Sequence, residues 1–86
     1  MKISVELTLT PIQDEYEPAI INFIDALRDS DLEVKENPLS TQVYGDYDEV
    51  MKVLNKEMKN ALEAVERGLI YMKIVKSDRR DYEPHF

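Results

Sequence analysis

Two neighbouring hydroxyl side chains, Ser40 and Thr41, are the residues of this sequence best suited to hold a polar ligand. They open a predicted strand at residues 39–44, and Thr8 lies on another predicted strand at residues 2–10. Because a hydroxyl group both donates and accepts hydrogen bonds, this set suits a ring nitrogen or an exocyclic amine. Threonine is also common in half-exposed strands that bind nothing, so the residue types leave both interpretations open.

Two groups of carboxylates, within residues 14–17 and 46–49, have the composition of a metal site but the spacing of a helix start. In each group an aspartate, Asp14 or Asp46, stands three residues before a glutamate, as in a capping box. Acidic side chains are stabilised there because they face free N–H groups and the positive end of the helix dipole. The spacing of a calcium loop is not present. We therefore predict two helix N-termini and no metal site.

Groups that could carry out catalysis are scarce in this sequence. The chain has no cysteine, and its one histidine, His85, stands with Tyr82 in a polar segment at the end of the sequence. Its two glycines, Gly45 and Gly68, do not belong to a phosphate-binding loop. No combination of nucleophile, base and oxyanion donor is visible. We expect a protein that is not an enzyme and uses neither a cofactor nor a metal.

Charge and hydropathy argue against two further classes of protein. Acidic residues number 18 against 11 basic ones, so no surplus of Lys and Arg exists to replace the counterions of a nucleic acid. No apolar run approaches the roughly 20 residues of a membrane span, and no signal peptide is visible. We expect a cytoplasmic protein without nucleic-acid or membrane partners. Its 86 residues predict one domain, residues 1–78, followed by a polar tail, residues 79–86.

Hydrophobic periodicity predicts the elements that position these residues. Residues 2–10 alternate between apolar and polar, which indicates a strand that ends at Pro11. Helical spacing follows Asp14, and it returns between Asp46 and a glycine cap at Gly68. The order βαββαβ predicts a ferredoxin-like α+β sandwich, in which a four-stranded antiparallel sheet carries both helices on one face. The three other strands are expected at residues 32–35, 39–44 and 69–75.

The alternation also assigns side chains to the two faces of the sheet. The face toward the helices should carry apolar residues of the first and last strands: Ile3, Val5, Leu7, Leu9, Ile70, Met72 and Ile74. The opposite face should carry a mixed set: Ser4, Glu6, Thr8, Thr10, Gln42, Tyr44, Leu69, Tyr71, Lys73 and Val75. Its apolar members are unusual on a solvated face, so we expect a second sheet to pack there in a homo-oligomer, a dimer or a tetramer. A partly apolar solvent face on a monomer is the alternative.

Three stretches of the sequence resemble the YkoF-like family of thiamine- and hydroxymethylpyrimidine-binding proteins. LTLTPI (residues 7–12) is similar to that family's strand followed by proline. LSTQVYGDYDEV (residues 39–50) is similar to its Ser-Thr strand, glycine and long helix. SDRRD (residues 77–81) resembles the charged tail of the single-domain branch. The stretches occur in the family's order, and the resemblance covers nearly the whole chain.

The resemblance implies a ferredoxin-like domain that binds thiamine or its hydroxymethylpyrimidine precursor without turnover and assembles through its sheets. It also implies that the threonine of the Ser-Thr strand, Thr41 in this sequence, binds the ligand. An aminopyrimidine needs a slot with apolar or aromatic walls and a few polar partners. Nearby residues of these types are Ser40, Thr8, Glu6, Gln42, Tyr44 and Tyr71.

The two rings of thiamine make different demands on such a site. The thiazolium ring is cationic, so Glu6 or the face of a tyrosine could stabilise it. The alternative function is that of a small structural or regulatory interaction domain, whose open sheet face serves only oligomer assembly.

Overall fold

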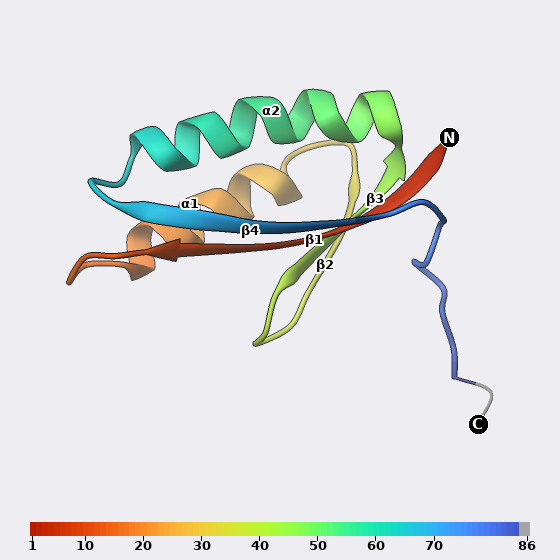
Figure 1. Ribbon diagram of the computed structural model, residues 1–86, viewed down its shortest axis with the longest axis horizontal. Coiled ribbons are helices and arrows are strands. Elements are labelled where there is room, and N and C mark those ends of the chain that lie inside the picture. Colours follow the sequence, from red (N-terminus) through yellow and green to blue (C-terminus); the bar gives the residue numbers. More distant parts are fainter. Residues whose placement is uncertain (85–86) are drawn as a thin grey trace.

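The computed structural model describes residues 1–84, so His85 lies outside the described part of the chain. The order of elements is β1 (Lys2–Pro11), α1 (Glu17–Arg28), β2 (Glu33–Glu36), β3 (Thr41–Asp46), α2 (Tyr47–Glu63) and β4 (Gly68–Val75). The strands form one sheet in the order β2-β3-β1-β4, and each neighbouring pair is antiparallel. Both helices lie on one side of the sheet, and the other side carries no helix (Figure 1). The predicted ferredoxin-like α+β fold is confirmed.

Strand β1 lies inside the sheet and supplies the centre of the hydrophobic core. Its alternate residues Ile3, Val5, Leu7 and Leu9 are buried, as the alternation predicts. The helices contribute the facing side chains of the same cluster: Ala19, Phe23, Leu27, Val50, Leu54, Ala61 and Val65. Full burial of one such aliphatic or aromatic side chain stabilises a fold by about 1.5–3 kcal/mol. A shift of β1 by one residue would expose this whole set, so the core fixes which polar residues face the open side.

Strand β4 is an edge of the sheet and is less covered than the sequence pattern suggests. The register pairs Val5 with Ile74 and Leu7 with Met72, which places both partners on the helix side as expected. Met72 and Ile74 nevertheless remain 36% and 44% exposed. Within residues 1–84 no strand lies beyond β4, so the outer flanks of these side chains stay open.

Helix α1 begins without the cap that the sequence pattern predicts at Asp14. Its N-cap residue is Tyr16, and no side chain bonds a free N–H group there. Pro18 occupies the first turn, where its fixed φ and missing N–H favour a helix start. The expected capping box is therefore wrong. The neighbouring Gln13 instead accepts a hydrogen bond from the backbone N–H of Glu66 at 3.1 Å.

Helix α2 has Asp46 as its N-cap residue, as predicted, but the carboxylate forms no cap hydrogen bond. One carboxylate oxygen lies 3.4 Å from Nζ of Lys2, and the other lies 3.8 Å from the N-terminal nitrogen of Met1. The predicted cap bond is thus replaced by ion pairs with the beginning of the chain.

The glycine cap predicted for the end of α2 is also wrong. The helix ends at Glu63, with Ala64 as its C-cap residue, and Gly68 is the first residue of β4. A Cβ atom at Gly68 would lie 3.2 Å from the carbonyl oxygen of Thr10 on the paired strand β1. The close approach of two backbones therefore accounts for this glycine.

Candidate functional site

The seven predicted site residues are divided between two hollows and one exposed position. The first hollow lies at the end of β3, is called the strand-end hollow below, and is lined by three of them: Thr8, Ser40 and Thr41. The second lies on the helix-free side of the sheet, is called the open-face hollow, and is lined by three more: Glu6, Gln42 and Tyr44. Tyr71 lines neither hollow.

The strand-end hollow exists because β1 is longer than β3. Pairing between the two strands ends at Leu7 and Thr41, and β1 continues to Pro11 with only β4 beside it. Residues of α1 and of the turn between β2 and β3 enclose the space beside this free edge. The hollow has a volume of about 180 Å³, and its other walls are largely apolar: Leu7, Leu9, Ile20, Phe23, Ile24, Pro38 and Leu39.

Asn37 shapes the turn that brings Ser40 to this hollow. Its Oδ1 accepts hydrogen bonds from the backbone N–H groups of Leu39 at 2.9 Å and of Ser40 at 3.1 Å. Its own N–H donates to the carbonyl oxygen of Ser40 at 3.1 Å. Such side-chain bonds to the following backbone are the reason asparagine favours turns. Strand β3 therefore starts at Thr41, two residues after the predicted start, and Ser40 belongs to the turn.

Thr41 lies on the helix side of the sheet, opposite Leu7, and is only 6% exposed. Its hydroxyl forms no hydrogen bond with another described residue. Within residues 1–84, however, no buried side-chain polar atom is sealed off without a partner. The hydroxyl of Thr41 is therefore still accessible, and because Thr41 lines the strand-end hollow, a ligand atom could be the partner of this hydroxyl.

Ser40 connects the two hollows through hydrogen bonds. Its Oγ donates to Oε2 of Glu6 at 3.0 Å and accepts from Nε2 of Gln42 at 2.7 Å. Glu6 and Gln42 lie directly opposite each other in the register of β1 and β3. A carboxylate on the open face is thereby held one hydrogen bond away from a residue that lines the strand-end hollow.

The open-face hollow has a volume of about 240 Å³ and rests on two adjacent rows of paired residues. In one row Ser4 lies opposite Tyr44, and in the next Glu6 lies between Gln42 and Lys73. Its remaining lining residues come from the strands and from the chain after β4: Val5, Val75, Arg79 and Tyr82. The hollow thus combines charged, amide and aromatic side chains.

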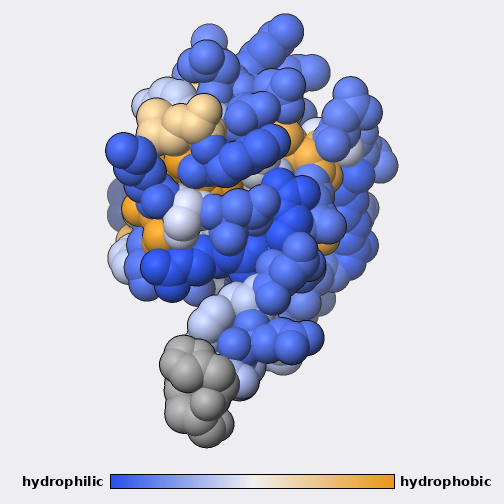
Figure 2. Space-filling model, turned by 90° about the vertical axis from the view of Figure 1, so that its right-hand side faces the viewer, coloured by the Kyte–Doolittle hydropathy of each residue, from blue (hydrophilic) through white to orange (hydrophobic). Residues whose placement is uncertain are grey.

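Residues 77–82, here called the tail segment, pack against this part of the open face. Oγ of Ser4 donates to the carbonyl oxygen of Ser77 and accepts from the backbone N–H of Arg79, both at 2.8 Å. Lys35 of β2 donates to the carbonyl oxygen of Arg80. Figure 1 shows the chain leaving β4 toward the side away from the helices, and Figure 2 shows mostly hydrophilic side chains at this end of the molecule. The tail segment therefore covers one part of the face on which a second sheet was expected.

Tyr44 is buried between β2 and the tail segment. Nζ of Lys35 lies 5.6 Å and the guanidinium carbon of Arg80 lies 5.9 Å from the centroid of its ring. Burial raises the pKa of the Tyr44 phenol, and the carboxylates of Glu33 and Asp78 raise it further. The phenol is therefore neutral at physiological pH and can donate a hydrogen bond.

Tyr71 lies opposite Thr8 on the open face. Tyr71 and its neighbour Leu69 are 56% and 50% exposed, so the tail segment leaves this part of the face uncovered. The open face therefore has a polar half beneath the tail segment and a more apolar half near the start of β4.

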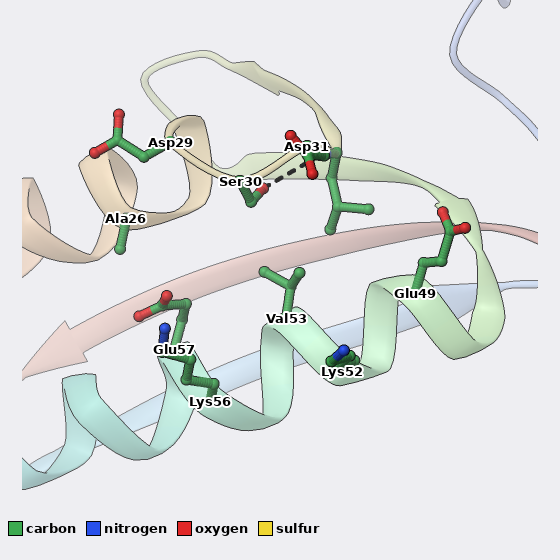
Figure 3. Close-up of a pocket in the computed structure, with 10 residues that line it drawn as sticks. Ala26, Asp29, Ser30, Asp31, Glu49, Lys52, Val53, Lys56 and Glu57 are labelled. Atoms are coloured by element: carbon green, nitrogen blue, oxygen red, sulfur yellow. Dashed lines mark hydrogen bonds between the residues drawn. The ribbon is translucent and has the colours of Figure 1, made fainter.

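A third hollow, of about 780 Å³, lies on the helix side between α2 and the loop after α1. Figure 3 shows Val53 of α2 pointing across it toward that loop, where Oγ of Ser30 accepts a hydrogen bond from the N–H of Leu32 at 3.3 Å. Two lysines and four acidic residues line it, together with no aromatic side chain and none of the predicted site residues. It offers no ring on which a pyrimidine could stack.

Sequence reasoning did not include five polar lining residues in a site: Ser4, Asn37, Lys73, Arg79 and Tyr82. The Asn37-Pro38 pair was a visible turn signal, and the alternation of β4 already placed Lys73 on the open face. No local pattern indicated Arg79, because its position depends on Ser4, 75 residues away in the sequence.

Residues 1–84 contain no group of three or more His, Cys, Asp and Glu side chains that could hold a metal ion. In the same part of the chain, no helix has the length and apolarity needed to cross a membrane.

Solved structures of several proteins are similar to this chain. A Thermotoga maritima protein, for which a role in thiamine biosynthesis or salvage has been suggested, has a TM-score of 0.80 at 16% identity, over 90% of this chain and 85% of its own. A hypothetical protein of Methanocaldococcus jannaschii has a TM-score of 0.74 at 26% identity, over 95% and 84% of the two chains. A Streptococcus pneumoniae protein has a TM-score of 0.75 at 23% identity, over 91% and 89%.

Comparison with curated proteins finds no match. The family model of the thiamine-binding proteins, in contrast, matches residues 5–86, which is nearly the whole chain. The matched range includes every residue that lines the strand-end hollow, all but Ser4 of those that line the open-face hollow, and the tail segment. The chain therefore belongs to the thiamine-binding protein family and has a thiamine-related role.

Proposed function

We propose that this protein binds thiamine or its hydroxymethylpyrimidine precursor without chemical turnover, and that the pyrimidine ring occupies the strand-end hollow. The observation that carries the proposal is that Thr41 lines this hollow and that its hydroxyl has no hydrogen-bond partner among the described residues. Membership of a thiamine-binding family supports a binding role rather than a catalytic one.

The size and lining of the strand-end hollow suit a single flat ring. Sites for drug-sized ligands have volumes of about 300–1,000 Å³, so a volume of about 180 Å³ favours one ring over a larger group. Phe23 and its aliphatic neighbours provide apolar walls, and Thr41 and Ser40 provide hydroxyls for ring nitrogens and an exocyclic amine. Beyond Leu7, the free edge of β1 adds backbone groups that β3 does not pair.

For thiamine itself, we place the thiazolium ring on the open face beside Tyr71. Thr8 lines the strand-end hollow and lies directly opposite Tyr71, so a ligand that leaves the hollow past Thr8 meets this exposed ring. The face of a tyrosine attracts a cation. Glu6, hydrogen-bonded to Ser40, adds a negative charge on the same face.

We also propose a homo-oligomer, a dimer or a tetramer, in which the uncovered half of the open face packs on a second copy. Leu69 and Tyr71 are both half exposed, and both lie on this half. Burial of these side chains would stabilise the contact by removing apolar surface from water. A second copy would also cover the proposed position of the thiazolium ring and so enclose the ligand.

The exposed pair Leu69 and Tyr71 also favours a second candidate function, that of an interaction domain whose open face serves only assembly. This function requires an oligomer but no ligand. Sedimentation in the presence and absence of thiamine, combined with a binding measurement, separates the two candidates.

A thermal-shift measurement tests the proposed ligand class. A ligand at 100 times its dissociation constant stabilises a protein by about 2.7 kcal/mol, which for a domain of this size corresponds to a rise in Tm of roughly 10–20 °C. We expect such a rise with thiamine and with hydroxymethylpyrimidine, and none with choline, a cation without a pyrimidine ring. Absence of a rise with both pyrimidines, in a folded sample, would contradict the proposed function.

A further inference from the structure

The open-face hollow is lined by two cationic side chains that form no ion pair within residues 1–84. They are Lys73 of β4 and Arg79 of the tail segment. The adjacent Arg80 differs, because its Nε lies 2.9 Å from Oδ1 of Asp78 and 3.6 Å from Oε2 of Glu33. Arg80 is thus paired with carboxylates of the protein, whereas the positive charge of Arg79 can interact with a ligand.

Arg79 is held in place by neutral groups. Its backbone N–H donates to Oγ of Ser4, and its side-chain Nε donates to Oγ of Ser77, both at 2.8 Å. The first bond holds the backbone and the second holds one nitrogen of the guanidinium, whose two terminal amino groups have no partner among residues 1–84. Such a fork has the geometry to bind two oxygens of one anion.

Lys73 lies directly opposite Glu6 in the sheet, yet the two side chains form no ion pair. Oε2 of Glu6 accepts its hydrogen bond from Ser40 on the other side of β1 instead. Glu6 is the one acidic side chain among the described lining residues, so the hollow carries one more positive than negative charge in a chain of net charge −7.

Aromatic side chains complete the lining. Tyr44 of β3 and Tyr82 of the tail segment both line the hollow, together with Gln42 of β3, whose side chain carries an amide. Two phenol rings beside two cations suit a ligand that has a flat apolar part and an anionic end.

We infer that the open-face hollow is a second ligand site, for a phosphate monoester of a small aromatic group, with Lys73 and Arg79 on the phosphate and Tyr44 and Tyr82 beside the ring. A phosphate dianion matches the guanidinium fork and the ammonium better than a single-charged group does. The inference concerns a different hollow from the one proposed for the pyrimidine ring, so either can fail without the other.

Phenyl phosphate is the probe for this site, titrated into the full-length protein. Binding is followed by isothermal titration calorimetry, because phenol and phenyl phosphate absorb in the same ultraviolet range as the tyrosines of the chain. We expect saturable binding of one phenyl phosphate per chain. Phenol, which has the ring alone, and inorganic phosphate, which has the anion alone, should each bind more weakly.

Charge-neutralising variants locate the site. Lys73→Gln and Arg79→Gln should each weaken phenyl phosphate binding by roughly 10- to 100-fold, as expected for loss of a charge-assisted hydrogen bond. Lys59→Gln and Arg67→Gln are matched controls, because these exposed residues line neither the strand-end hollow nor the open-face hollow. Glu6→Gln should strengthen binding, because it removes the negative charge of the hollow.

Three results would overturn the inference. They are the absence of saturable phenyl phosphate binding at millimolar concentration, equal binding of phenol and phenyl phosphate, and unchanged affinity in both the Lys73 and the Arg79 variants. Because these two residues lie on different elements, a folding defect in one variant does not remove the test.

Discussion

Thr41 and Gln42 are adjacent in the sequence, but they lie on opposite faces of the sheet. Thr41 pairs with Leu7 and lies on the side of the helices, whereas Gln42 pairs with Glu6 on the open side. The polar residues that a single pocket was expected to gather are therefore separated by the sheet itself. Ser40, in the turn before β3, is the residue that touches both groups.

Tyr71→Asp should shift the protein from oligomer to monomer. The substitution places a charge in the proposed contact on the uncovered half of the open face, where it would lose its hydration on assembly. Sedimentation velocity at micromolar concentration measures the effect. Tyr16→Asp is the matched control, because Tyr16 is similarly exposed but precedes α1. A monomer of about 10 kDa in the unaltered protein would contradict the proposed oligomer.

Asp46→Ala should lower the free energy of unfolding by less than about 1 kcal/mol, because exposed ion pairs contribute little. A true N-cap would contribute about 0.5–2 kcal/mol, but the Asp46 carboxylate pairs with Lys2 and the N-terminus instead. Urea denaturation at low and high salt distinguishes the two. The loss should shrink at high salt, since salt screens exposed charges; a larger loss that salt leaves unchanged would show that Asp46 caps the helix.

Asp78 should contribute to stability at neutral pH and lose that contribution in acid. Hydrogen bonds from the side chain and the backbone N–H of Arg80 lower the pKa of Asp78 below its ordinary value of 3.8. A lowered folded-state pKa means that the stabilisation is present above the ordinary value and is lost as the pH falls through the folded value. The difference in Tm between the protein and its Asp78→Asn variant should therefore disappear at low pH. A difference that stays constant from pH 7 to pH 2 would show that the charge of Asp78 has no part in it.

Much of the fold was predictable because its signals are local. The unbroken alternation of β1 indicated both its buried face and its polar face, and the order of elements then determined the topology. The start of α1 was misplaced because the acidic pattern at Asp14 and the proline at position 18 both indicate a helix start, and the proline decided it. Likewise, position 68 is a glycine because the backbone of β1 lies close to it. A sequence pattern for a helix end cannot reveal this contact.

The candidate site was predictable only in part, because it depends on contacts between distant residues. The residue types were visible in the sequence. Because successive residues of a strand point to opposite faces of the sheet, the sequence also separates Thr41 from Gln42 on β3. The length difference between β1 and β3, which creates the strand-end hollow, depends on the turn at Asn37. The tail segment is held by Ser4, which lies at the other end of the sequence, and no periodic pattern reports such a bond.

Glu6→Gln should weaken thiamine binding more than binding of hydroxymethylpyrimidine. Only thiamine carries a fixed positive charge, and Glu6 supplies the negative charge that we place near it. Calorimetry with both ligands measures the difference, and Glu57→Gln on α2 is a control for the loss of one negative charge at a residue that lines neither the strand-end hollow nor the open-face hollow. Equal losses for the two ligands would remove Glu6 from the proposed thiazolium site.

Calorimetric titration of hydroxymethylpyrimidine into the Thr41→Val variant tests the central claim most directly. Valine keeps the branched shape of threonine but removes the hydroxyl, so β3 should remain intact while the ring loses its partner. We expect the free energy of binding to become less favourable by roughly 1–3 kcal/mol, because a polar atom of the bound ligand is left unpaired. Thr10→Val, on the same sheet but outside both hollows, should bind as the unaltered protein does. Unchanged affinity in a folded Thr41→Val protein would contradict the placement of the pyrimidine ring in the strand-end hollow.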